Sequence, residues 1–177
     1  VGDIFRILHH SRSALNVGIV GLGAGAMACY ARPSDTFKFF ELDPEIIRIA
    51  TESRYFTFLN DCAPKAEVIE GDGRLKLMRE PDASFDILTL DAFSGDVVPA
   101  HLLTKEALKI YQSKTRDGGV LLLHLSNRFL DLVPNVIRIA SAGKLRSFVR
   151  ADPGSSEDGE SGPRYPSTYL AIPLGYE

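Results

Sequence analysis

The apolar run at residues 16–21, which ends in a cluster of glycines, is the feature that most limits the folds open to this chain. The run reads NVGIVG, and the glycine cluster reads GLGAG over residues 21–25. A short apolar run stopped by glycines predicts a buried strand that turns tightly into a helix, here expected over Ala24–Ala31. Strands that are apolar on both faces occur in parallel sheets that helices cover. The run therefore predicts an α/β fold.

The same alternation of apolar runs and helical segments continues along the chain. Strands are expected over 37–43, 66–72, 85–93, 120–126, 145–151 and 168–173, and helices over 44–56, 73–79, 105–114 and 129–142. This pattern predicts a doubly wound, mostly parallel sheet of about seven strands with an antiparallel last strand. We expect one domain over residues 1–177. Within it, residues 1–13 are expected to be the remnant of a preceding segment, and residues 152–166 a flexible loop.

Composition argues against several classes of partner. The net charge is −3 and no long basic run is present, so neither nucleic acid nor an anionic membrane surface is expected to bind. No stretch approaches the roughly 20 apolar residues that span a bilayer, so this segment is not expected to insert into a membrane. The cysteines, Cys29 and Cys62, lack metal-binding spacing. We therefore expect reduced thiols and no metal site.

A glycine loop and an acidic residue predict where a ligand binds. In doubly wound sheets, ligands bind outside the carboxyl ends of the strands. Gly21, Gly23 and Gly25 allow a tight turn and close approach of the backbone to a ligand at the start of the next helix. Glu41 ends the second predicted strand about twenty residues after Gly21, a position from which a carboxylate accepts hydrogen bonds from ribose hydroxyls. These residues predict a nucleoside-binding site.

Two further acids follow predicted strands. Asp72 lies between Gly71 and Gly73, and its carboxylate could accept a hydrogen bond from the amino group of adenine while Gly73 lets the base approach. The alternative is that Asp72 caps the next helix. Asp91 follows an apolar strand, where a carboxylate is costly unless it has a partner or a ligand. We expect Asp91 to line the cofactor site and to act as a general base on an amine.

His124 has two interpretations. It ends the predicted strand 120–126, so its side chain could point into the same crevice as the acids. A lone histidine on an apolar strand is, however, more often a buried residue with its hydrogen bonds satisfied. The second interpretation is preferred.

A nicotinamide dinucleotide is the rival ligand. Gly21, Gly23 and Ala26 also fit the G-x-G-x-x-G/A pattern, and Glu41 has the spacing that this pattern requires. An acid at position 72 would, however, lie unfavourably beside a pyrophosphate, and the acid at position 91 has no evident part in hydride transfer. The chain also has no room for a separate substrate domain. A mononucleoside therefore fits better.

Taken together, these residues give the chain a resemblance to the spermidine synthase family, the polyamine aminopropyltransferases of the class I S-adenosylmethionine-dependent methyltransferase superfamily. The matching motifs are VGIVGLGAG at 17–25, FELDPEII at 40–47, EGDGR at 70–74 and FDILTLDAF at 85–93. Residues 90–104 resemble a divergent bacterial branch that is often fused to membrane domains. The resemblance implies a Rossmann-like fold and an adenosyl cofactor, S-adenosylmethionine or its decarboxylated form.

The resemblance also implies roles for single residues. Glu41 would hold the ribose hydroxyls, Asp72 would meet the adenine, and Asp91 would take the proton from an attacking polyamine or other amine, with methylthioadenosine as the product. A homodimer is expected by the same resemblance. The cofactor and the expected reduced thiols indicate the cytoplasm, or the cytoplasmic face of a membrane if the chain is part of a fused protein.

The chain departs from the family pattern at two positions. Ala24 stands where the family usually has an acid that helps to bind an amino group, and Ser94 stands where a second acid usually follows the catalytic one. Two alternatives therefore stay open. One is a methyltransferase that uses S-adenosylmethionine on a small molecule, and the other is a non-catalytic nucleoside-binding domain of a larger membrane protein.

Overall fold

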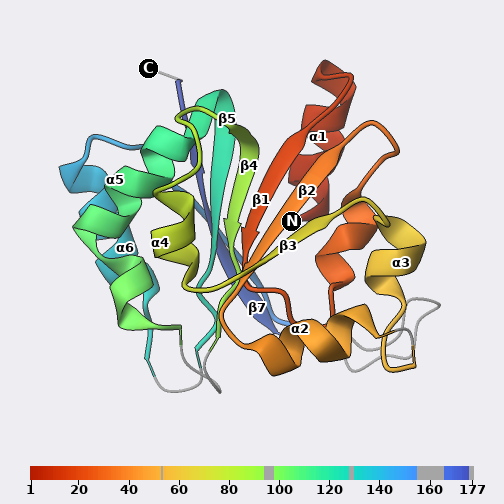
Figure 1. Ribbon diagram of the computed structural model, residues 1–177. Coiled ribbons are helices and arrows are strands. Elements are labelled where there is room, and N and C mark those ends of the chain that lie inside the picture. Colours follow the sequence, from red (N-terminus) through yellow and green to blue (C-terminus); the bar gives the residue numbers. More distant parts are fainter. Residues whose placement is uncertain (53, 94–97, 128–129, 155–165, 176–177) are drawn as a thin grey trace.

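The computed structural model describes residues 1–177 except 53, 94–97, 128–129, 155–165 and 176–177 (Figure 1). The strands form one sheet in the order β3-β2-β1-β4-β5-β7-β6. Their bounds are β1 Asn16–Val20, β2 Thr36–Glu41, β3 Glu67–Glu70, β4 Phe85–Leu90, β5 Thr115–His124, β6 Phe148–Asp152 and β7 Ser167–Pro173. The α-helices are α1 Gly2–Ser11, α2 Pro44–Thr51, α3 Phe58–Cys62, α4 Gly73–Leu77, α5 Lys105–Lys114 and α6 Val133–Ala142, and the 3-10 helices are η1 Ala26–Tyr30 and η2 Ala100–Leu103.

The topology confirms the predicted fold class. Strands β1 to β5 pair in parallel, and β7 runs antiparallel to both β5 and β6. In register, Val20 at the end of β1 lies beside Phe40 on β2 and Leu90 on β4. The segments that follow these strands therefore leave the sheet at the same edge, where a doubly wound fold binds its ligands.

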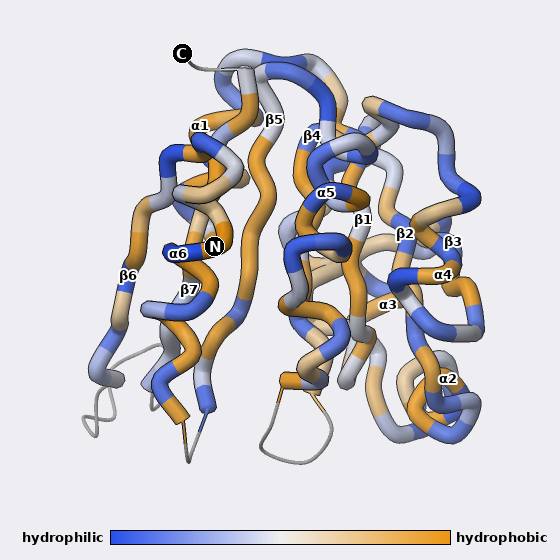
Figure 2. Tube along the Cα trace, turned by 90° about the vertical axis from the view of Figure 1, so that its left-hand side faces the viewer, coloured by the Kyte–Doolittle hydropathy of each residue, from blue (hydrophilic) through white to orange (hydrophobic). Residues whose placement is uncertain are grey.

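Helices cover both faces of the sheet and bury an apolar layer on each (Figures 1 and 2). One layer contains Leu108 and Tyr111 of α5 with Leu88 of β4. The other contains Phe5 of α1 with Phe39 of β2. Strands β1 and β4 are buried almost throughout, which explains why their sequences are continuous apolar runs.

The predicted elements are confirmed in order but differ at several bounds. The α-helix expected over 24–31 is the shorter 3-10 helix η1, because Gly25 adopts a left-handed conformation (φ +84°) immediately before it. Helix α6 begins at Val133, since Pro134 lies in its first turn, where a missing N–H costs nothing. Strand β5 begins at Thr115, and its register against β4 shifts between Phe85 and Ile87.

The N-terminal residues form part of the core. Helix α1 lies within the segment 1–13 that was expected to be a remnant, and it buries Phe5 and Leu8. The Phe5 ring stacks on Tyr30 with centroids 4.8 Å apart. The flexible loop expected over 152–166 lies mostly outside the described residues, so its flexibility stays a prediction.

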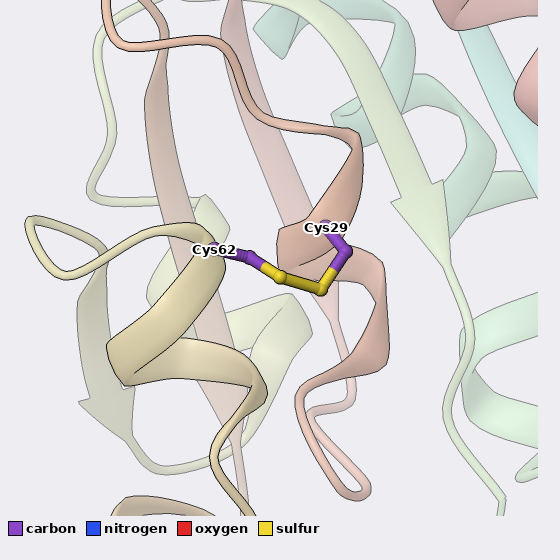
Figure 3. Close-up of a disulfide and its surroundings, with 2 residues drawn as sticks. All are labelled: Cys29 and Cys62. Atoms are coloured by element: carbon purple, nitrogen blue, oxygen red, sulfur yellow. A yellow bond between two sulfur atoms is a disulfide. The ribbon is translucent and has the colours of Figure 1, made fainter.

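The expectation of reduced cysteines is wrong. Cys29 of η1 and Cys62 of α3 form a disulfide with their Cα atoms 4.7 Å apart (Figure 3). The physical reason is the packing of the unpredicted helix α3 against η1, which brings two cysteines 33 residues apart within bonding distance. Because disulfides are rare in the cytosol, the cysteines no longer support a cytoplasmic location.

Candidate functional site

A cavity of about 500 Å³ lies at the carboxyl ends of β1, β2 and β4. It collects six of the seven residues that the sequence predicts for a cofactor site, namely Gly21, Gly23, Glu41, Asp72, Gly73 and Asp91. The seventh, Gly25, is not among the residues that line it. Side chains of η2 form part of the wall. The geometry thus brings together residues from four separate turns of the chain.

The glycine loop packs tightly on one side and is open on the other. Gly21 has φ +99°, and a Cβ atom there would lie 2.3 Å from the Asp91 carbonyl oxygen. At Gly23 (φ +54°) a Cβ atom would meet no heavy atom within 4 Å. Gly25 packs instead against Leu59 of α3. Gly21 therefore lets β1 and β4 approach, Gly23 leaves the rim of the cavity free of side chains, and Gly25 serves the helix packing.

Glu41 is held by the backbone of two turns. Its Oε2 accepts a hydrogen bond from the Leu22 N–H at 2.9 Å, and its Oε1 accepts one from the Asp43 N–H at 3.0 Å. These bonds fix the carboxylate at the end of β2 beside the glycine loop. Each oxygen keeps acceptor capacity, because a carboxylate has about four lone-pair sites in all.

Asp72 does cap the helix that follows it. Its Oδ1 accepts a hydrogen bond from the Leu75 N–H at 2.9 Å at the start of α4. Its Oδ2 lies 3.3 Å from Nε2 of His101 on η2. The capping role raised by the sequence is therefore present, and a contact with adenine stays a prediction that would involve the second oxygen.

Asp91 is bonded to His124. Asp91 Oδ1 lies 2.6 Å from His124 Nδ1, and His124 Nε2 lies 2.8 Å from Ser126 Oγ. An ionised carboxylate only accepts hydrogen bonds, so the short contact places a proton on Nδ1. The Ser126 hydroxyl in turn accepts a hydrogen bond from the Thr168 N–H of β7 at 2.9 Å. The segments at the ends of β4, β5 and β7 thus supply one connected network of hydrogen-bonded polar groups.

Aromatic rings enclose the imidazole. Tyr169 stacks on His124 with centroids 4.2 Å apart and planes 11° apart, and Phe93 meets it edge to face at 4.8 Å. Burial, with a smaller contribution from the negative charge of Asp91, raises the pKa of the Tyr169 phenol. This tyrosine therefore stays neutral at ordinary pH.

The preferred interpretation of His124 as a core residue did not include its hydrogen bond to Asp91. Both ring nitrogens are bonded, as that interpretation expects, but one bond goes to the predicted general base. The signal lay in strand order: Leu90 pairs with Leu123, so residues 91 and 124 lie side by side at the ends of neighbouring strands. That pairing becomes evident only once β4 and β5 are known to be adjacent.

Among the described residues, no group of three or more His, Cys, Asp or Glu side chains is placed to hold a metal ion. Over the same residues, no helix is both long enough and apolar enough to cross a bilayer.

No protein-family model matches the chain. A polyamine aminopropyltransferase of Vibrio vulnificus is 32% identical over 108 residues, which are 58% of this chain and 35% of that protein. A probable spermidine synthase from Corynebacterium glutamicum superposes with a TM-score of 0.74 at 23% identity, over 97% of this chain and 61% of that structure. The chain resembles the spermidine synthases.

The resemblance expected from the sequence motifs is therefore confirmed, together with the class I methyltransferase type of fold. Human methyltransferase-like protein 13, solved in complex with SAH, superposes with a TM-score of 0.66 at 22% identity, over 91% of this chain and 72% of that structure. The chain thus spans about a third of the curated relative and less than two thirds of the spermidine synthase structure.

Proposed function

We propose that the chain is the adenosyl-binding domain of a spermidine synthase-like transferase, which moves an aminopropyl group from decarboxylated S-adenosylmethionine to a polyamine or another amine. The observation that carries this proposal is the convergence of Glu41, Asp72 and Asp91 on one cavity beside the glycine loop. The ligands of this reaction, a sulfonium and an ammonium, are both cationic. A cavity lined by four acidic residues, the three named above and Asp43, suits such ligands electrostatically.

Each acid has a distinct part in the proposal. Glu41, oriented by two backbone N–H groups, accepts hydrogen bonds from the ribose hydroxyls. Asp72 uses the oxygen that does not cap α4 to accept from the adenine amino group. Asp91 takes the proton from the attacking ammonium. The amine nitrogen then forms a bond to the carbon next to sulfur, the C–S bond breaks, and its electron pair stays on sulfur in methylthioadenosine.

The comparisons support the class of cofactor more than its form. The curated relative is named a polyamine aminopropyltransferase, and the human neighbour was solved with SAH. SAH is an adenosyl compound, so this neighbour supports an adenosyl-type ligand. Because the chain covers only part of these proteins, we propose the activity for this chain rather than transfer it from them.

A ligand-binding experiment tests the cofactor half of the proposal. Thermal unfolding is measured with methylthioadenosine, S-adenosylmethionine, its decarboxylated form and NAD. A ligand present at about 100 times its Kd stabilises the folded state by roughly 2.7 kcal/mol, which is a rise of roughly 5–10 °C for a domain of this size. A rise with NAD alone would overturn the proposed ligand, and so would no rise with any adenosyl compound.

Matched variants locate the ligand. Glu41→Gln removes a carboxylate from the cavity, and we expect it to weaken methylthioadenosine binding by about tenfold or more, the cost of a charged hydrogen bond. Glu70→Gln makes the same chemical change at an exposed position outside the cavity lining. It is expected to leave the affinity unchanged. Equal effects of the two variants would mean that the ligand binds elsewhere.

A methyltransferase is the second candidate. Ala24 is the observation that favours it, since the glycine loop then offers no acid to hold the amino group of the transferred chain. The position of the second missing acid, Ser94, lies outside the described residues. Assays with the decarboxylated cofactor and with methyl-labelled S-adenosylmethionine distinguish the candidates by which group reaches the acceptor. Binding without transfer of either group would indicate a non-catalytic nucleoside-binding domain.

A further inference from the structure

The Asp91 carboxylate is fixed at one oxygen, and its other oxygen has no hydrogen-bond partner in the part of the chain that the structure describes. The backbone of Asp91 is tied to β1 by its N–H bond to the Val20 carbonyl at 2.8 Å. Its side chain is 25% exposed, and Oδ1 is taken by His124. Within the described residues, Oδ2 makes no hydrogen bond. The residue therefore presents one defined oxygen to an incoming proton.

The partner of Oδ1 is itself fixed by β7. Ser126 Oγ already accepts the Thr168 N–H, so its own proton is free to point at His124 Nε2. That arrangement gives both ring nitrogens of His124 and the Ser126 hydroxyl a hydrogen-bond partner when the imidazole carries its single proton on Nδ1. Stacking on Tyr169 sets the plane of the ring. The imidazole can neither rotate nor change tautomer without losing one of these contacts.

We infer that His124 is a positioning residue for Asp91, which orients the carboxylate through Nδ1–H and leaves Oδ2 to take the proton of the acceptor amine. The inference rests on the proposed function of Asp91 as base. It adds that the histidine itself neither accepts this proton nor touches the substrate. Removal of a hydrogen-bond partner that orients a catalytic side chain typically lowers the rate by about 10–100-fold.

Three substitutions at position 124 separate the two nitrogens of the ring. Asparagine places an amide N–H near the position of Nδ1 and restores the bond to Asp91. Glutamine reaches the position of Nε2 and restores only the contact with Ser126. Phenylalanine keeps the stacking on Tyr169 and restores neither bond. The order of activity among these variants therefore reports which bond matters.

The measured quantities are kcat for aminopropyl or methyl transfer, whichever the wild type performs, and the Kd for methylthioadenosine. His124→Gln and His124→Phe are expected to lower kcat by about 10–100-fold, whereas His124→Asn loses less than about fivefold because the Asp91 bond survives. The Kd should change less than about twofold in all three, since the ring does not line the cavity. Equal losses in the Asn and Gln variants, or a loss that appears only in Kd, would overturn the inference.

A second measurement is independent of turnover. The nitrogen chemical shifts of the four histidines distinguish Nδ1–H from Nε2–H, and His124→Asn identifies the signal of His124. We expect the Nδ1–H tautomer in the wild type and its loss in Asp91→Ala, which removes the acceptor of this N–H. An Nε2–H tautomer in the wild type overturns the inference even if transfer is active. The Nδ1–H tautomer in a chain without transfer would overturn the proposed function and leave the orientation of Asp91 standing.

Discussion

Gly21 lies against the backbone of Asp91, so closely that a methyl group on the glycine would be 2.3 Å from the Asp91 carbonyl oxygen. The contact joins the first residue after β1 to the first residue after β4. The Asp91 N–H donates to the Val20 carbonyl beside it, at 2.8 Å. The cofactor loop and the proposed base are thus built on the same few atoms, and a change in one displaces the other.

Gly21→Ala is expected to destabilise the fold by about 2–4 kcal/mol, because it combines a backbone clash with a left-handed conformation. Gly23→Ala is the matched control: its φ is also positive, but its Cβ would enter open space. We expect a cost of only about 1–2 kcal/mol there. Urea denaturation measures both. If the two variants have the same unfolding free energy, the contact with Asp91 is not what requires glycine at position 21.

Asp72→Asn and Asp72→Ala separate capping from binding. Asparagine caps helices about as well as aspartate, whereas alanine costs about 1 kcal/mol at such a position. We therefore expect the Asn variant to keep the stability of the wild type and to lose affinity for methylthioadenosine, and the Ala variant to lose both. Calorimetric titration and urea denaturation report the two quantities. Wild-type affinity in Asp72→Asn would remove Asp72 from the binding site.

The disulfide is expected to contribute about 3–4 kcal/mol to stability, since it closes a loop between residues 33 positions apart. Cys29→Ser, Cys62→Ser and the double variant should lose similar amounts, because each breaks the same bond. Chemical denaturation with and without a reductant measures the effect. The double variant should not respond to the reductant. A wild-type midpoint that the reductant leaves in place would show that the bond does not stabilise the fold.

Asp35 is expected to make the fold sensitive to acid. Its side chain is fully buried, which alone would raise its pKa, but N–H groups of Arg32 and Leu15 bond the charged form and hold the pKa below the usual value of 3.8. With the folded pKa depressed, this stabilisation is present above pH 3.8 and is lost as the pH falls through the folded value. Asp35→Asn should lower stability at pH 7 and flatten its decline in acid. Denaturant titrations between pH 3 and pH 7 compare the slopes, and parallel slopes would contradict the assignment.

The parts of the fold that could be predicted are those that depend on local sequence patterns. The continuous apolar runs predict β1 and β4, because a strand that is buried on both faces can be identified without knowing which strands lie beside it. Thr104 marks the start of α5, and its hydroxyl accepts the Ala107 N–H at 3.2 Å as an N-cap should. The acids 41, 72 and 91 could be placed at one edge because parallel strands end together.

The parts that could not be predicted depend on contacts between distant segments. Cysteine spacing does not reveal pairing, and α3 is too short to show a periodic pattern, so the bond between Cys29 and Cys62 stays hidden. The contact between Asp91 and His124 requires β5 beside β4, and the support of Ser126 requires β7 beside β5. The sequence pattern predicts these strands, but it does not predict which of them are neighbours in the sheet.

The anchor of Ser126 has a consequence for the order in which the molecule is made. A chain leaves the ribosome from its N-terminus, so the glycine loop, the three acids and His124 all emerge before Thr168 on β7. The residues that line the cavity are therefore synthesised before the strand that steadies the histidine. The Ser126 hydroxyl gains its bond from Thr168 only once β7 lies between β5 and β6, so a strand made near the end of the chain completes the support of Asp91.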